Sequence, residues 1–138
     1  MINSINWFPA ALISLFCFGL WGFFTKVAIN YIDPKSALIY QTMGIAVIGV
    51  ITLSLVSFKP AGDIRGVSFG LLSGLATGIG FLFYLIAADK GKVTTIVTMT
   101  ALYPLITIFL AYIILSEGIN LKQGAGILLA LVAIYLLS

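Results

Sequence analysis

Long apolar stretches alternate with short polar connections along the whole of this 138-residue chain. Cutting the sequence at its charged residues leaves five mostly apolar segments, approximately residues 7–29, 36–58, 66–88, 93–115 and 121–137. A helix needs about 20 such residues to cross the hydrocarbon core of a bilayer. The pattern therefore predicts five transmembrane helices, which form one domain over residues 1–138.

Turn and helix-stop residues occupy the connections between these segments. Asp33 is placed to cap the second helix, and Pro34 fits its first turn. Pro60 lies in the next connection, and Asn120 and Gln123 have the spacing of a capping box before the last helix. Because the connections are short, sequential helices should be antiparallel neighbours, so we expect an all-helical membrane bundle.

The composition excludes most classes of water-soluble protein. Hydrophobic residues make up 62% of the chain and charged residues 8%, and the mean hydropathy is +1.21. A soluble domain has roughly 45–50% apolar and about 25% charged residues. The sequence has no histidine, and its four carboxylates fall in loops or at helix ends, so it offers no acid–base pair and no cluster of metal ligands. We therefore expect a multi-pass protein of the plasma or inner cell membrane that is not an enzyme and needs no cofactor or metal.

Positive charges are nearly balanced between the two sides of the membrane. With five spans, Lys59, Arg65 and Lys122 lie on the N-terminal side, and Lys26, Lys35, Lys90 and Lys92 lie on or near the other side. The positive-inside rule then gives almost no bias. Either other features set the orientation, or the chain inserts both ways and pairs as an antiparallel dimer. Two inverted copies would reproduce the inverted-repeat architecture of many secondary transporters.

Polar and aromatic residues inside the spans are the candidates for contacts with a substrate. Lys26 is the one charge embedded in an apolar context, where it either reaches toward the headgroups or faces a central cavity. Gln41, if buried in the second span, needs a partner or a ligand. Trp21, Tyr84 and Tyr103 are the aromatic residues that we expect to line a cavity with them.

Two further features predict close packing or bending of helices. Gly70, Gly74 and Gly78 recur every four residues in the third span, so they form a face that permits close contact with another helix or sliding against it. Pro104 interrupts the hydrogen bonding of the fourth span, where threonines and Tyr103 cluster. That span therefore bends there, either as a simple kink or as a bend that contacts substrate.

Several short motifs together resemble one known domain family. They are Trp21-Gly22 followed by Lys26, Asp33-Pro34, the stretch from Tyr84 to Ala88, the stretch 100–107 and the stretch 115–128. Their order resembles the EamA domain of the drug/metabolite transporter superfamily over essentially the whole chain. Many relatives have an arginine in the second span, where this chain has Gln41 or its neighbours.

The resemblance implies a transporter of half the usual size. Family members commonly have ten spans built from two inverted EamA repeats around a central cavity, and this chain matches one repeat. It would therefore work with a second copy of itself in inverted orientation, as a dual-topology homodimer. We expect it to export small metabolites or amphiphilic compounds by alternating access, without simple proton coupling because no carboxylate lies in the membrane core.

Two alternatives remain open at this point. The chain could be half of a heterodimeric transporter or of a lipid-linked sugar flippase. It could also be a membrane scaffold or accessory subunit that transports nothing.

Overall fold

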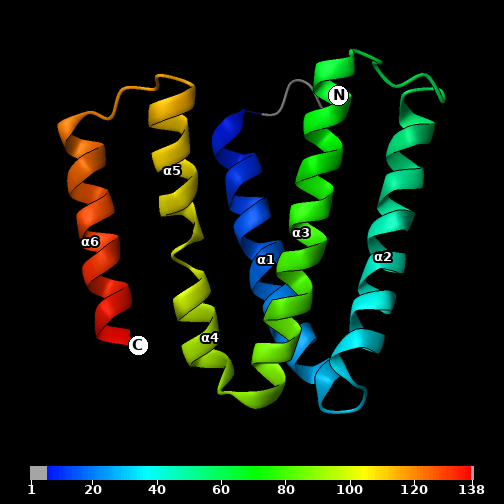
Figure 1. Cartoon of the computed structure of the whole chain (residues 1–138), viewed down its shortest axis with the longest axis horizontal. Helices are drawn as coiled ribbons and strands as arrows, with labels where there is room; N and C mark the ends of the chain where they lie inside the picture. The colour runs from blue at the N-terminus through cyan, green and yellow to red at the C-terminus, as the bar shows by residue number, and fades with distance from the viewer. Residues whose placement is uncertain (1–5, 138) are drawn as a thin grey trace. The chain divides into compact units, whose positions relative to one another are not determined.

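A computed structural model describes residues 6–137, and the described part of the chain is all-helical (Figure 1). The helices are α1 (Trp7–Ile29), α2 (Pro34–Leu55), α3 (Ile64–Lys90), α4 (Val93–Thr100), α5 (Tyr103–Ile114) and α6 (Leu121–Leu137). The chain forms two compact units. The first unit contains α1–α3, and the second contains α4–α6.

The predicted membrane spans correspond closely to these helices. α1, α2, α3 and the consecutive pair α4–α5 (Val93–Ile114) give four stretches long and apolar enough to cross a bilayer. α6 is apolar but has 17 residues. Its length of about 25 Å is at the lower end of the range for a spanning helix. The all-helical, multi-pass membrane fold is thus confirmed, with four clear span candidates and one shorter helix.

The second helix ends three residues earlier than the sequence predicted. α2 stops at Leu55, and Ser57 and Phe58 have φ values of 54° and 58°. The Ser57 N–H donates to the Ser54 carbonyl at 3.0 Å, and the Phe58 N–H donates to the Leu53 carbonyl at 3.0 Å. This pair of bonds is a Schellman motif, which satisfies carbonyls that the end of a helix leaves free.

The fourth predicted span is interrupted rather than merely bent. α4 ends at Thr100 and α5 begins at Tyr103, one residue before Pro104. The Leu102 N–H turns back to the Met99 carbonyl at 3.2 Å. Proline has no N–H to give and its ring clashes with the carbonyl four residues earlier, so the helix cannot run through this point.

Polar side chains cap the helix starts as the sequence predicted. The Ser36 hydroxyl donates to the Asp33 carboxylate, which also accepts from the backbone N–H groups of Ser36 and Lys35 at 3.1 and 3.0 Å, and these bonds lower the pKa of Asp33 from its ordinary value of 3.8. At the start of α6, the side chains of Asn120 and Gln123 accept from each other's backbone N–H at 2.9 and 3.0 Å. The capping box is therefore formed.

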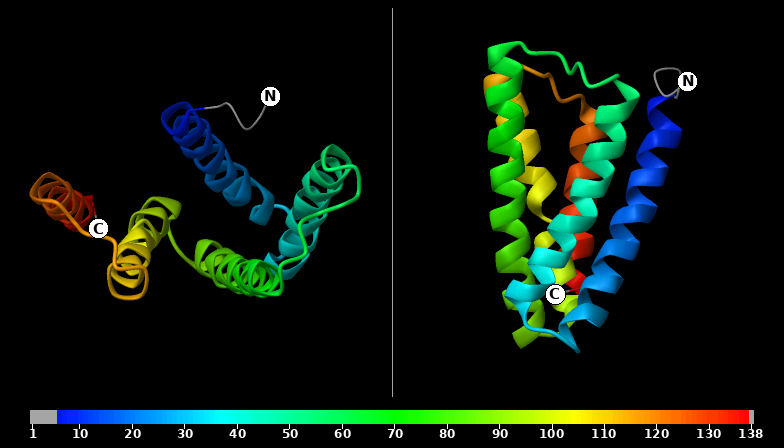
Figure 2. Two further views of the ribbon diagram at one scale, coloured as in Figure 1. Left: turned by 90° about the horizontal axis from the view of Figure 1, so that it is seen from above. Right: turned by 90° about the vertical axis from the view of Figure 1, so that its right-hand side faces the viewer.

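Burial in the first unit is confined to one end of its helices. The buried residues are Gly22, Thr25 and Ile29 of α1, Ala37 of α2, and Tyr84, Leu85 and Ala88 of α3. Figure 2 shows α1 and α2 drawing together at this end and diverging toward the other. The end where α1 and α3 finish and α2 begins is therefore the packed part of the unit.

Candidate functional site

Three helices supply the residues of a polar and aromatic cluster at the packed end of the first unit. We define the cluster as Trp21, Thr25 and Lys26 of α1, Gln41 of α2, and Phe81 and Tyr84 of α3. Trp21 and Thr25 are four residues apart on α1, and Phe81 and Tyr84 are three apart on α3, so each pair lies on one face of its helix. Gln41 follows the buried Ala37 by one turn.

The aromatic rings of the cluster pack against one another across α1 and α3. The Trp21 ring stacks on Phe81 with 4.9 Å between ring centroids and an interplanar angle of 28°. Tyr84 lies 4.8 Å from Trp21 and is tilted by 42°. Such pairs contribute about 0.5–1.5 kcal/mol beyond the area they bury. The rings therefore hold the two helices together at this level.

Two hydrogen bonds join the helices around these rings. The Gln41 Nε2 amide donates to Thr25 Oγ1 at 3.0 Å, which ties α2 to α1. The Lys26 ammonium donates to the Ala88 carbonyl oxygen at 2.8 Å, which ties α1 to α3. Ala88 is among the last residues of α3, whose carbonyls have no partner within the helix.

Three polar atoms of the cluster are buried without a hydrogen-bond partner. They are Trp21 Nε1, Gln41 Oε1 and the Tyr84 hydroxyl. Gly22 lies beside the Tyr84 hydroxyl, because a Cβ built on Gly22 would be 3.8 Å from the hydroxyl oxygen. A buried polar group without a partner costs about 1–3 kcal/mol. The cluster therefore holds three such atoms, one from each of three helices.

The structure brings together four of the five residues predicted to contact substrate. Trp21, Lys26, Gln41 and Tyr84 all belong to the cluster. Tyr103 lies in the second unit, as the first residue of α5, and is 63% exposed. Thr25 was not predicted, although its spacing of four residues from Trp21 was a signal for it. The Ala88 carbonyl was not predicted either, because it is a backbone atom that no residue pattern marks.

The residues predicted to pack or bend are not among the cluster residues. A Cβ built on Gly70, Gly74 or Gly78 would meet nothing within 4 Å in the described part of the chain. That glycine face is therefore open. The threonine hydroxyls near Pro104 bond to their own helix, since Thr98 donates to Thr94 and Thr100 to Ile96 at 2.7 and 2.8 Å.

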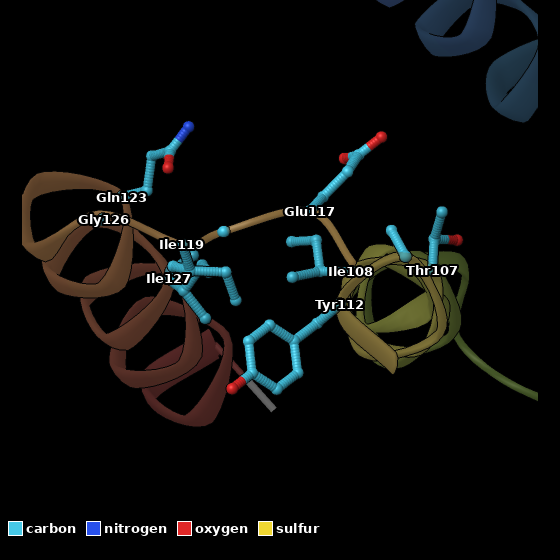
Figure 3. Close-up of a pocket in the computed structure, with 11 residues that line it drawn as sticks. Thr107, Ile108, Tyr112, Glu117, Ile119, Gln123, Gly126 and Ile127 are labelled. Carbon is cyan, nitrogen blue, oxygen red and sulfur yellow. The ribbon is translucent and has the colours of Figure 1, made fainter. Parts of the chain in front are cut away.

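A groove of about 500 Å³ lies between α5 and α6 in the second unit (Figure 3). Ile108, Ile119 and Ile127 point into it from its walls, and Tyr112 lies across one side. Glu117 and Gln123 lie at its edge with their polar ends directed outward. The interior of the groove is therefore mainly hydrocarbon, in contrast to the polar cluster of the first unit.

Comparisons with known proteins agree with this architecture. A protein of Methanocaldococcus jannaschii, described as uncharacterized, is 28% identical over 131 residues, which cover 92% of this chain and 91% of the relative. No solved structure matches the chain. The model of a family of transporters, not of enzymes, matches residues 5–138. The chain therefore belongs to the EamA-like transporter family.

Proposed function

We propose that this membrane protein is a secondary transporter that exports small metabolites or amphiphilic compounds across the cell membrane by alternating access. Trp21, Gln41 and Tyr84 contact the substrate, and Lys26 lies beside them. The observation that carries the proposal is the set of three buried polar atoms without partners, one from each of α1, α2 and α3.

Energetics connect these atoms to transport. Unpaired polar groups are costly in a low-dielectric environment, and a substrate that pairs with them offsets that cost. Binding can then favour one arrangement of the three helices over another, because a ligand shifts a conformational equilibrium by its difference in affinity for the two states. The closed cluster corresponds to an arrangement that must open to admit the substrate.

The proposed transporter is a dual-topology homodimer in which two inverted copies complete the ten-helix inverted-repeat architecture. The nearly equal positive charge on the two sides of the membrane supports it. The M. jannaschii relative supports it as well, since the match to this chain covers 91% of that protein. In this proposal Tyr103 lines the cavity, Pro104 marks a hinge, and Gly70, Gly74 and Gly78 form a helix-packing face.

Solute efflux from proteoliposomes tests the transport proposal. Vesicles preloaded with a mixture of amino acids, sugars and carboxylic acids would be sampled over time by mass spectrometry. We expect at least one solute to leave faster than from protein-free vesicles, and to do so without a pH gradient. Tyr84→Phe and Gln41→Leu each remove polar atoms while nearly keeping the side-chain volume, and each should slow efflux by about tenfold, the effect of about 1.4 kcal/mol.

Tyr40→Phe is the matched control for these variants. Tyr40 is also a span tyrosine of the first unit but is 64% exposed, so its hydroxyl is outside the cluster. Its efflux rate should equal that of the unmodified protein. Efflux of no solute at all would overturn the transport proposal and favour an accessory role, and an equal loss in Tyr40→Phe would overturn the assignment of the site.

A further inference from the structure

We infer that Lys26 makes this site selective for small organic anions that carry an apolar or aromatic body. The inference rests on the proposed function, because it assigns a substrate class to the same cluster. Lys26 is the one charged side chain of the cluster, and no carboxylate pairs with Lys26 within residues 6–137.

The four carboxylates of the chain either cap helices or are exposed. The Asp33 carboxylate accepts from the backbone N–H groups of Lys35 and Ser36 at the start of α2, and the Asp63 carboxylate accepts from those of Arg65 and Gly66 at the start of α3. Asp89 follows Ala88 directly but is exposed, and Glu117 is exposed in the second unit. A half-buried cation without a counter-ion is unfavourable in a membrane protein, so an anion that reaches it gains binding free energy.

Lys26 retains hydrogen-bonding capacity for such an anion. An ammonium group has three N–H donors, and one of them is used by the Ala88 carbonyl at 2.8 Å. That bond fixes the ammonium between α1 and α3, on the same two helices as Trp21 and Tyr84. The remaining donors are available to a carboxylate, and charge-assisted hydrogen bonds are roughly twice as strong as neutral ones.

The unpartnered atoms of the cluster are also suited to an anion. Trp21 Nε1 can only donate, and the Tyr84 hydroxyl can donate as well, so both are suited to an anionic ligand of the cluster. Gln41 Oε1 can only accept, which would suit a hydroxyl or amine elsewhere on the ligand. The packed rings of Trp21, Phe81 and Tyr84 supply an apolar surface for the rest of the molecule.

Three probes of one shape and different charge test the selectivity. Phenylacetate is an anion, phenylacetamide is neutral, and phenethylammonium is a cation. The chain has two tryptophans, so a Trp7→Phe background leaves Trp21 as the single fluorescent reporter inside the site. We expect saturable changes in Trp21 emission, with phenylacetate bound at least about tenfold more tightly than either of the other probes.

Variants of Lys26 separate its charge from its role at the end of α3. Lys26→Met keeps an apolar chain of similar length and should reduce phenylacetate affinity to that of the amide, while amide affinity changes less than about twofold. Lys26→Arg keeps the charge and should keep the preference. Lys90→Met is the control, because it removes an exposed charge two residues after Ala88 on α3. It should leave the preference for phenylacetate in place.

Each remaining outcome would overturn the inference in a distinguishable way. An equal loss of affinity for all three probes in Lys26→Met would mean that Lys26 only holds the helices together. Tighter binding of the amide or ammonium probe by the unmodified protein would refute anion selectivity but leave the site itself intact. No response of Trp21 to any probe would refute the inference, and the efflux assay would then decide separately whether transport remains.

Discussion

At the scale of single residues, Gln41 combines a satisfied and an unsatisfied polar atom in one side chain. Its Nε2 donates to Thr25 at 3.0 Å, and its Oε1 is buried without a partner. Thr25 is only 2% exposed, so water has little access to the bond between them. The pair therefore orients the amide such that its oxygen is held ready for another donor.

This arrangement predicts that Thr25→Val destabilises the protein more than Gln41→Leu. Without the Thr25 hydroxyl, both ends of the buried amide lack a partner, which costs about 1–3 kcal/mol. Gln41→Leu instead removes the amide nitrogen and the amide oxygen together, so no unpaired atom of this side chain is left. The hydroxyl of Thr25 can then bond to its own helix, as Thr42 and Thr77 do at 2.9 and 2.8 Å. We therefore expect Gln41→Leu to cost less than about 1 kcal/mol.

Thermal unfolding in detergent measures both effects. Thr42→Val is the control, because Thr42 is exposed on α2 and bonds only to the carbonyl of Leu38. Its unfolding temperature should match that of the unmodified protein. If Gln41→Leu proved the more destabilising of the two cluster variants, the amide would be stabilising the fold rather than awaiting a ligand.

Sequence could identify most of this site residue by residue but could not supply its contacts. Trp21, Lys26, Gln41 and Tyr84 stand out because polar groups are rare within apolar spans. The bond from Lys26 to the Ala88 carbonyl depends on which turn of α3 faces α1, and periodicity in one helix does not determine that. Tyr103 satisfied the same sequence criterion but lies in the second unit, outside the packed cluster.

At the scale of elements, sequence predicted helix starts better than helix ends. Helix starts depend on local side chains, so the capping residues Asp33, Asn120 and Gln123 indicate them directly in the sequence. The end of α2 was missed because a left-handed residue after a helix is usually glycine, and this chain has Ser57 there. The break before Pro104 was expected as a bend, but local turns at Ala101 and Leu102 separate it into two helices.

The end of α2 predicts that Ser57→Gly stabilises the protein. A left-handed conformation costs a residue with a side chain roughly 1–2 kcal/mol, and glycine avoids this at the price of about 0.5–1 kcal/mol of extra chain entropy. A net gain of up to about 1 kcal/mol should appear as a higher unfolding temperature in detergent.

Ser54→Gly provides the opposite case three residues earlier. Ser54 is within the last turn of α2, and its hydroxyl donates to the Ile51 carbonyl at 2.7 Å. Glycine inside a helix destabilises by about 0.5–1 kcal/mol, so this variant should unfold at a lower temperature. Equal destabilisation by both substitutions would mean that Ser57 is not left-handed in the protein in solution.

At the scale of the whole molecule, apolar side chains on the spans are largely exposed within one copy of the chain. Leu72 of α3 is 59% exposed, and Phe83 is 66% exposed. Gly70, Gly74 and Gly78 form a further open face on the same helix. In a membrane such surfaces contact lipid or another helix, and a glycine face is typical of contacts between helices. The fold therefore leaves surface available for the inverted second copy that we propose.

Membrane orientation tests that pairing directly. In a Cys17→Ser background, single cysteines that leave the charges unchanged would be placed by Gly91→Cys directly after α3 and by Ala61→Cys in the connection before it. Both positions are exposed, and α3 separates them, so a spanning α3 places them on opposite sides of the membrane.

An impermeant thiol reagent applied to intact cells should label about half of each variant if the chain inserts both ways, because its charge bias is close to zero. Permeabilised cells give the total for each position. Full labelling of one variant with none of the other would mean a single orientation, in which case the antiparallel homodimer is wrong and any inverted partner must be a different chain.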